Sequence, residues 1–220
     1  MDLLIPYHDR YEAGRILAGK LRAFQDPADL LVLALPRGGV PVAFEVAQSL
    51  HAPLDVLIVR KLGVPGEEEL AFGAIASGGV RVVNQGLVRR MRLTEGMISR
   101  IEAREKSELD RREQAYRGGR PAPPVRDRTV IVIDDGLATG ATMMAAVRAL
   151  RQQDPQEIIV AVPVAAREVC DMLRREADHI VCPATPKPFH GVGRWYQNFS
   201  ETTDDEVRDL LEQAARKPVS

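Results

Sequence analysis

Apolar residues along the chain occur in two patterns: short continuous runs, and longer stretches in which they recur every three or four positions. The short runs, rich in β-branched residues, predict strands buried on both faces of a sheet, and the helical spacing predicts helices that pack on that sheet. The predicted strands are 30–35, 54–60, 129–134, 157–163 and 179–182, with further short strands within 71–84. The predicted helices are 7–24, 40–50, 94–116, 141–152, 167–176 and one that begins near Thr203. This alternation predicts an α/β fold with a mostly parallel central sheet and helices on both faces.

The chain has a length typical of one domain. Its 220 residues contain no internal repeat or low-complexity tract, and the one linker-like segment, 118–124, is rich in Gly and Pro. The helix predicted at 94–116 is dense in charges of both signs and has few apolar positions after Ile101. We expect its main face to be solvated, with a contact in a homodimer as the alternative.

The most specific pattern follows the strand at 129–134. Four apolar β-branched residues lead into Asp134 and Asp135, and a turn then opens the next helix. The turn residues are Ala138, Thr139, Gly140, Ala141 and Thr142. Free backbone N–H groups and the positive end of the helix dipole meet at such a turn, which predicts a phosphate site, and the acids beside it suit neighbouring sugar hydroxyls. The alternatives are an ordinary strand-to-helix turn or the magnesium ligands of an NTPase, but the chain has no GxxxxGK(S/T) loop.

This string closely resembles the signature of the type I phosphoribosyltransferase family, which binds 5-phosphoribosyl 1-diphosphate (PRPP) with four apolar residues, two acids and a Thr-Gly-x-Thr turn. The resemblance implies that Asp134 and Asp135 grip the ribose and that 138–142 hold the 5-phosphate. It also implies a single domain over 1–220 with the type I phosphoribosyltransferase-like fold. Its core would cover about 25–183, and the N-terminal helix and 184–220 would serve as a small hood region or as docking elements. Mg²⁺ would be bound mainly through PRPP, so no protein metal ligand is predicted.

A second turn, after the strand at 30–35, contains Arg37, Gly38 and Gly39. The glycines permit an unusual backbone with exposed N–H groups, and Arg37 offers paired donors. Taken alone, the sequence is equally typical of a tight strand-to-helix turn. The family resemblance implies that it binds diphosphate.

Two cations, Arg60 and Lys61, end the strand predicted at 54–60 and suit a multiply charged ligand. We expect them to bind diphosphate, the alternative being solvated charges at a strand end. The resemblance implies a mobile loop after them, at 64–69. The residues expected to be catalytic are Arg37, Lys61, Asp134 and Asp135.

The acceptor is poorly specified by the sequence. Ala138 stands where enzymes of this family that act on 6-oxopurines usually carry Asp, which argues against hypoxanthine or guanine. Gly136 departs from the apolar residue that the family usually has after the two acids, and we expect it to open space beside the ribose. Trp195 and Tyr196 are suited to stack on a flat base, or else to pin the C-terminal segment onto the core.

Composition acts mainly by exclusion. The 30 basic and 31 acidic residues nearly balance and form no basic stripe interleaved with aromatics, so no nucleic-acid partner is expected. The longest apolar run, 158–166, is shorter than the ~20 residues that span a bilayer, and Met1 to Leu4 contain no basic residue. We therefore expect a cytoplasmic protein without a membrane partner. Cys170 and Cys182 are expected to be buried reduced thiols.

Together these features predict a Mg-dependent phosphoribosyltransferase of nucleotide metabolism. It would move the 5-phosphoribosyl group from PRPP to a nitrogenous base, rather a nucleobase than an amine, and release diphosphate. Two other classes of function stay open. One is a PRPP- or nucleotide-sensing regulator without turnover, and the other is a hydrolase in which water replaces the base.

Overall fold

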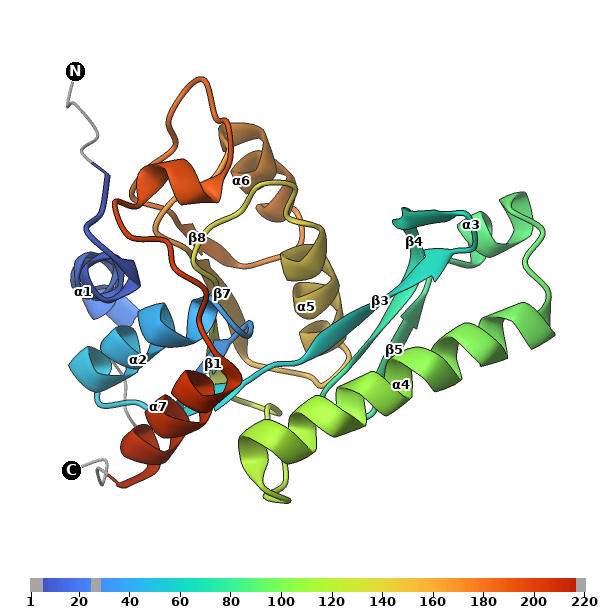
Figure 1. The fold of residues 1–220 in the computed structure, drawn as a ribbon, viewed down its shortest axis with the longest axis horizontal. Helices are drawn as coiled ribbons and strands as arrows, with labels where there is room; N and C mark the ends of the chain where they lie inside the picture. The colour runs from blue at the N-terminus through green and yellow to red at the C-terminus, as the bar shows by residue number, and fades with distance from the viewer. Residues whose placement is uncertain (1–5, 25–28, 217–220) are drawn as a thin grey trace.

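The apolar runs form a five-stranded parallel sheet in the order β2-β1-β6-β7-β8 (Figure 1). Its strands are β1 (Leu30–Ala34), β2 (Leu54–Val56), β6 (Thr129–Ile133), β7 (Glu157–Ala161) and β8 (His179–Val181). The computed structural model describes residues 6–24 and 29–216, apart from the Glu69 side chain, so Met1 to Leu4 lie outside the described residues. The predicted α/β fold with a mostly parallel central sheet is confirmed.

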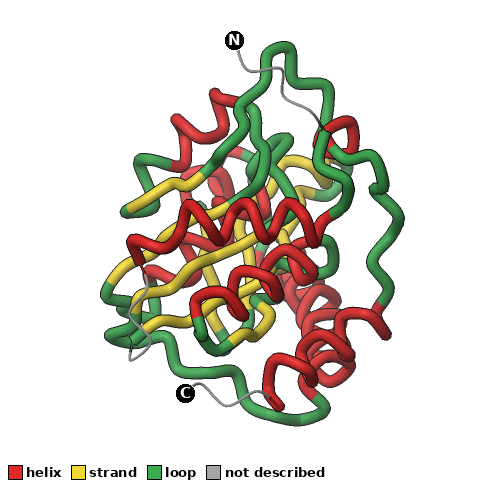
Figure 2. Tube along the Cα trace, turned by 90° about the vertical axis from the view of Figure 1, so that its left-hand side faces the viewer, coloured by secondary structure: helices red, strands yellow, loops and turns green. Residues whose placement is uncertain are grey.

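Helices cover both faces of this sheet, because successive residues of a buried strand point to opposite sides. Leu30 and Val32 face one helical layer, whereas Leu31 and Leu33 face the other. The first layer contains α1 (Arg10–Leu21), α2 (Gly39–Leu50) and α7 (Asp204–Arg216), and the second contains α5 (Ala141–Arg151) and α6 (Arg167–Leu173). Figure 2 shows the strands in the middle of the molecule with helices around them. Each layer buries its own apolar core.

An arm made of a second, antiparallel sheet and two helices extends from the core between β2 and β6 (Figure 1). Its elements are β3 (Val59–Val64), β4 (Glu67–Ala76), β5 (Val80–Val83), α3 (Gln85–Arg90) and α4 (Glu95–Arg117). The prediction of one strand over 54–60 is wrong, since β2 joins the parallel sheet and β3 the arm. The loop expected at 64–69 is a hairpin, because Pro65 and Gly66, whose φ is 82°, form a tight turn between β3 and β4.

Helix α4 is attached by apolar contacts of Leu109 and Tyr116 and by ion pairs that each have one buried member. Arg60 of β3 donates to Glu105 through Nε (2.9 Å) and Nη2 (2.6 Å), and the Glu105 side chain is 8% exposed. Near the end of α4, Arg117 donates to the Asp55 carboxylate (3.0 Å) and to the carbonyl oxygen of Val56 (2.6 Å). Much of α4 is solvated as predicted, but Glu105 and Arg117 are buried. Glu105 binds the helix to the arm sheet, and Arg117 binds it to β2.

Residues 7 and 8 lie beside the C-terminal segment (residues 192–204). The Tyr7 N–H donates to the Trp195 carbonyl oxygen (2.9 Å), the Gln197 N–H to that of Tyr7 (2.8 Å), and the Asn198 N–H to that of His8 (2.9 Å). Because α1 follows directly, this pairing fixes the start of α1 beside residues 195–200. The helix predicted at 7–24 is shorter than expected, as it ends in the 3₁₀ turn η1 (Arg22–Phe24).

Two further features of the described residues concern expectations from composition. None of their helices combines the length and the apolar character needed to cross a bilayer. Cys170 of α6 is buried and Cys182 after β8 is half-buried, and both are free thiols.

Candidate functional site

The most specific sequence patterns meet where β1 and β6 end. These strands are neighbours, with Ala34 opposite Ile133, and the Leu35 N–H extends their pairing by donating to the Ile133 carbonyl oxygen (2.8 Å). The glycine turn (36–39) after β1 and the acid pair (Asp134 and Asp135) after β6 therefore leave the same edge of the sheet. Parallel sheets bind ligands at this edge.

Two glycines allow the glycine turn to touch the acid pair. A Cβ atom on Gly38 would lie 2.1 Å from Oδ2 of Asp135, and one on Gly39 would lie 2.7 Å from the Ile133 carbonyl oxygen. Gly38 has φ −59° and ψ −30°, a conformation open to most residues, so the unusual backbone of this turn lies at the cis peptide bond between Pro36 and Arg37 and not at Gly38. Glycine is needed at 38 because a side chain would occupy the space of the Asp135 carboxylate.

The acid pair is held from the two ends of the chain. Arg10 Nε donates to Asp135 Oδ2 (2.8 Å), and Tyr196 Oη donates to the Asp135 carbonyl oxygen (2.6 Å). Burial raises the pKa of both carboxyls; the charge of Asp135 raises the pKa of Asp134 further, while the Arg10 guanidinium lowers both. Two adjacent desolvated carboxyls favour a ligand that donates hydrogen bonds or brings positive charge.

Arg10 is a site residue without a sequence signal, because it lies 125 positions before its partner Asp135. The local signal at this position is the cap of α1, where the Asp9 side chain accepts the Glu12 N–H (2.8 Å). That cap indicates where the helix begins but carries no information on what Arg10 contacts.

The α5 turn (138–142) presents backbone donors at the start of α5. Gly140 has φ 70°, and a Cβ atom there would lie 2.5 Å from Cγ1 of Val169, so glycine is needed for both conformation and packing. Thr139, Ala141 and Thr142 are exposed around it. The first N–H groups of a helix lack partners within the helix, which leaves this turn open to an anion.

Lys61 faces the α5 turn across a cavity of about 300 Å³ between the arm and α5. Lys61 and Asn84 line the cavity from the arm, and Thr139 and Ala141 line it from the core. No residue of the glycine turn lines this cavity. The structure thus brings Lys61 to the predicted 5-phosphate turn, whereas we expected it beside diphosphate.

Arg60 and Arg37 contact acids outside the acid pair. Arg60 points to the opposite face of β3 from Lys61, as strand alternation requires, and it pairs with Glu105. The structure does not bring it to the glycine turn. The Arg37 side chain, 38% exposed, pairs with Glu201 and lies 3.8 Å from Asp204 (Nη1 to Oδ1), so it contacts the C-terminal segment.

The two aromatic residues predicted for a base pocket have different surroundings. Tyr196 is 5% exposed and packs on Tyr7 and Phe199, with ring centroids 5.6 Å and 5.1 Å away. This is the packing alternative, with the hydroxyl supporting Asp135. Trp195 is half-buried, and its Nε1 is buried without a hydrogen-bond partner in the described part of the chain.

The space expected beside Gly136 is filled. A Cβ atom on Gly136 would lie 2.6 Å from Cγ1 of Val192 and 3.0 Å from Cγ1 of Val164. The glycine therefore admits the C-terminal segment against the end of β6 and does not enlarge a ligand site.

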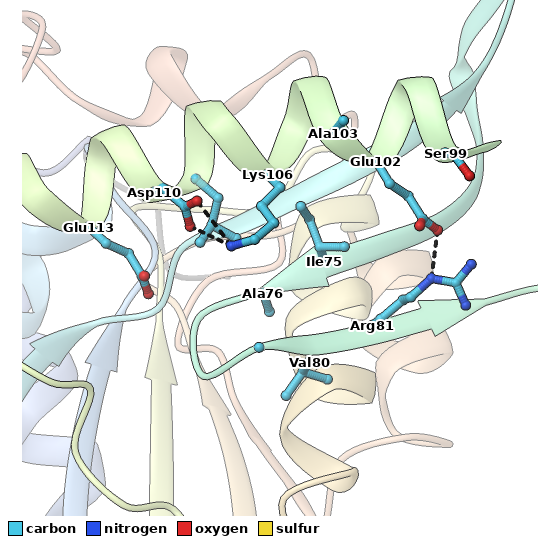
Figure 3. A pocket seen from close by; sticks show the side chains of 12 residues that line it. Ile75, Ala76, Val80, Arg81, Ser99, Glu102, Ala103, Lys106, Asp110 and Glu113 are labelled. Carbon is cyan, nitrogen blue, oxygen red and sulfur yellow. Dashed lines mark hydrogen bonds and ion pairs between the residues drawn. The ribbon is translucent and has the colours of Figure 1, made fainter. Parts of the chain in front are cut away.

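A larger cavity of about 420 Å³ lies apart from these residues, between α4 and the arm sheet (Figure 3). Ile75 lies beside it, and its walls carry the ion pairs Arg81 to Glu102 (2.6 Å) and Lys106 to Asp110 (2.9 Å). None of the predicted site residues lines it.

The donor set at the acid pair fits a metal ion that arrives with its ligand. The described residues contain no group of three or more His, Cys, Asp and Glu that could hold a metal ion. Asp134 and Asp135 supply carboxylate oxygens, the ligand type that Mg²⁺ prefers, and Mg²⁺ commonly completes its shell with water and phosphate oxygens. The residues therefore fit Mg²⁺ bound mainly through a phosphorylated ligand.

Comparisons with known proteins identify the family of the chain. The sequence model of the phosphoribosyl transferase domain matches residues 9–183. Two proteins from strains of Mycobacterium tuberculosis, provisionally named phosphoribosyl transferases, are 47% identical over 210 residues, which cover 96% of this chain. The chain spans about half the length of these relatives (47%).

Solved structures extend the comparison to the fold. A protein of Thermus thermophilus superposes with a TM-score of 0.86 at 40% identity, covering 95% of this chain and 99% of that one. A protein of Aquifex aeolicus shares the fold at 13% identity, with a TM-score of 0.51 over 92% of this chain and 84% of that one. With its family signature at the edge of the parallel sheet and a family match over most of its length, the chain belongs to the phosphoribosyl transferase domain family.

Proposed function

We propose that this protein transfers the 5-phosphoribosyl group of PRPP to a nitrogenous base, with release of diphosphate and dependence on Mg²⁺. The contact between the glycine turn and the acid pair carries the proposal, because Gly38 leaves room for the Asp135 carboxylate. PRPP bears its diphosphate directly on the ribose, so the groups that bind the diphosphate and the ribose hydroxyls must be neighbours.

Each part of the site takes one part of the ligand in this proposal. Asp134 and Asp135 accept hydrogen bonds from the ribose hydroxyls, and the α5 turn binds the 5-phosphate with its backbone N–H groups. The glycine turn and Arg37 bind diphosphate. Lys61 supplies positive charge on the 5-phosphate side, because it lines a cavity with Thr139 and Ala141. Arg60 is left out, since Glu105 holds it on the other face of the arm.

The reaction breaks the bond between ribose C1 and a diphosphate oxygen, and the electron pair leaves with diphosphate. The acceptor nitrogen forms the new bond to C1 and loses its proton. The side chains orient the ribose and stabilise charge as it builds on the leaving group, so positioning and electrostatics supply the rate. Bound Mg²⁺ would offset the diphosphate charge.

Two residues bear on the acceptor. Ala138 provides no acid at the position where 6-oxopurine enzymes of the family carry one, which supports a base other than hypoxanthine or guanine. Trp195 is half-buried, so its ring keeps surface on which a flat base can stack, and we place it on the acceptor side in that role; its buried Nε1 takes no part. Tyr196 supports Asp135 and is not proposed to touch the base.

The test measures diphosphate release from PRPP and Mg²⁺ with pooled purines, pyrimidines and other nitrogen heterocycles, beside an acceptor-free control. We expect release that depends on one pool. Asp134→Asn with Asp135→Asn should abolish PRPP binding, whereas Asp110→Asn, which alters an exposed pair on α4, is the matched control. Equal release without acceptor would show a hydrolase, and binding without release under any pool would show a sensor.

A further inference from the structure

Arg10 is bonded directly to the acid pair, yet the proposed reaction gives it no part. Its side chain is 11% exposed and that of Asp135 is 14% exposed, so water screens their contact weakly. The Nε to Oδ2 distance of 2.8 Å is that of a charge-assisted hydrogen bond. A buried pair of this kind, at the edge where the ligand binds, affects both the charge and the direction of the acid.

Three contacts fix the orientation of the Arg10 guanidinium. Nη1 donates to the carbonyl oxygen of Ser200 (2.7 Å), and Cζ lies 4.0 Å from the centroid of the Phe199 ring and 5.9 Å from that of Tyr196. Aromatic faces attract a guanidinium, and the planar donor group loses little freedom when it is held from several sides. The C-terminal segment thereby holds Arg10 in the position from which it reaches Asp135.

The contact with Arg10 gives the two Asp135 side-chain oxygens different surroundings. Oδ2 lies against Arg10 and under Gly38, where an added Cβ atom would be 2.1 Å from Oδ2 and 3.2 Å from Arg10 Nε. Among the described residues, the one side-chain hydrogen bond to the Asp135 carboxylate is made at Oδ2, which leaves Oδ1 for a ligand. The charged groups that face Asp135 are Arg10 from α1 and Asp134 next to it, with the Tyr196 hydroxyl on its carbonyl oxygen.

We infer that Arg10 is the positioning residue of the ribose site, which holds Oδ2 of Asp135 and thereby directs Oδ1 to a ribose hydroxyl. The inference rests on the proposed function, because it concerns the ligand that the acid pair binds. Without Arg10, the Asp135 carboxylate would lose the charged donor that fixes its direction, and Oδ1 would no longer be held toward the ligand.

The experiment compares ribose 5-phosphate with 2-deoxyribose 5-phosphate, by calorimetric titration of the full chain. Wild type should prefer ribose by roughly tenfold or more, as expected for a hydrogen bond to a charged group. Arg10→Gln should lose most of that preference, because the Asp135 carboxylate is then no longer held by a charged donor. Affinity for inorganic phosphate, which tests the α5 turn alone, should stay within about twofold of wild type.

Two control variants separate the effect of the Arg10 charge from that of a change elsewhere on α1. Arg10→Lys keeps the charge and should restore part of the ribose preference. Arg15→Gln alters the same helix at an exposed pair with Glu45 (3.2 Å, with the Arg15 side chain 58% exposed) and should change nothing. If Arg10→Gln does not fold, Phe199→Leu removes the ring beside the guanidinium and should lower the ribose preference by a smaller factor.

The outcomes separate this inference from the function on which it rests. Wild type that binds neither sugar phosphate nor Mg–PRPP contradicts the proposed function and the inference with it. Wild type that binds, together with a folded Arg10 or Phe199 variant that keeps the full ribose preference, overturns the inference alone. A variant that loses inorganic phosphate as well as ribose 5-phosphate also overturns it, because Arg10 would then only support the fold.

Discussion

Different interactions stabilise the parallel sheet and the junction of the arm sheet with α4. All five residues of β1 are buried and apolar, and so are four of the five in β6 and in β7. In β3 only two of six residues are buried, and Arg60 joins this strand to α4 through Glu105. The stabilisation gained by removing apolar surface from water depends mainly on the area buried. The stabilisation from an ion pair depends on the presence of both partners, on their geometry and on the salt concentration. The core should therefore tolerate substitutions of similar volume. The arm sheet also buries apolar side chains, such as Leu62 and Phe72, against α3, but its junction with α4 should depend on single partners.

The largest effect is expected in the core. Ile131→Ala should reduce the free energy of unfolding by about 2–5 kcal/mol, because Ile131 is fully buried and its truncation leaves a cavity. Ile75→Ala removes the same atoms from a half-buried position of the arm and should cost clearly less. Urea denaturation of both variants measures the difference. Equal losses would mean that the arm is packed as tightly as the core.

In the arm, the sharpest single change is Glu105→Gln, which leaves Arg60 and Arg104 without their carboxylate. The expected loss is about 1–3 kcal/mol, below that of a fully buried pair because the Arg60 side chain is 29% exposed. Hydrogen exchange should quicken in β3 and α4 and stay unchanged in β6. High salt should shrink the difference between wild type and variant.

A matched control lies on the same helix. Asp110→Asn breaks the pair with Lys106 (2.9 Å) in which both side chains are more than half exposed, so its effect on stability should be under about 1 kcal/mol. If Asp110→Asn opens the arm as much as Glu105→Gln does, burial of the pair is not what holds α4.

The same contrast explains how far the sequence could predict the structure. The strands at 129–134 and 157–163 were predicted because continuous β-branched runs have few other uses, and the acids after β6 because strand, acids and turn are adjacent in sequence. The two strands within 54–64 were not separated, because Leu57 and Ile58 continue the apolar run while the chain leaves one sheet for the other. Contacts set by distant residues, such as Arg10 with Asp135 or Arg37 with Glu201, leave no local pattern at all.

The acid pair places two ionisable side chains at the edge of an otherwise apolar core. Asp134→Asn tests how the burial of one of these charges affects stability. Burial raises the pKa of Asp134 above its unfolded value, so the stability it contributes is present below the unfolded pKa and is lost as pH rises through the folded pKa. Asn carries no charge to desolvate, and the variant should be more stable than wild type near neutral pH by about 1–2 kcal/mol. Its advantage should vanish below about pH 4, where Asp134 is protonated in both states.

Denaturant midpoints across this pH range, paired with Mg–PRPP titrations, measure both sides of the change. The variant should gain stability while its affinity for Mg–PRPP falls by roughly tenfold or more, the value of a hydrogen bond to a charged group. Lower stability of the variant at neutral pH would show that ionised Asp134 makes structural contacts that outweigh its burial.

The smallest effect is expected at Arg37, a predicted site residue that forms an exposed ion pair. Glu201 pairs with Arg37, and its side chain is 72% exposed, so the pair is worth no more than about 1 kcal/mol. Diphosphate must compete with Glu201 for the guanidinium, and Glu201→Gln should therefore raise the affinity for inorganic diphosphate by up to roughly fivefold, more at low salt. Asp205→Asn, which removes the partner of Arg208 nearby on α7, should leave that affinity unchanged. If Glu201→Gln instead weakens diphosphate binding, Glu201 orients Arg37 for the ligand, and the C-terminal segment completes the site rather than competing with its ligand.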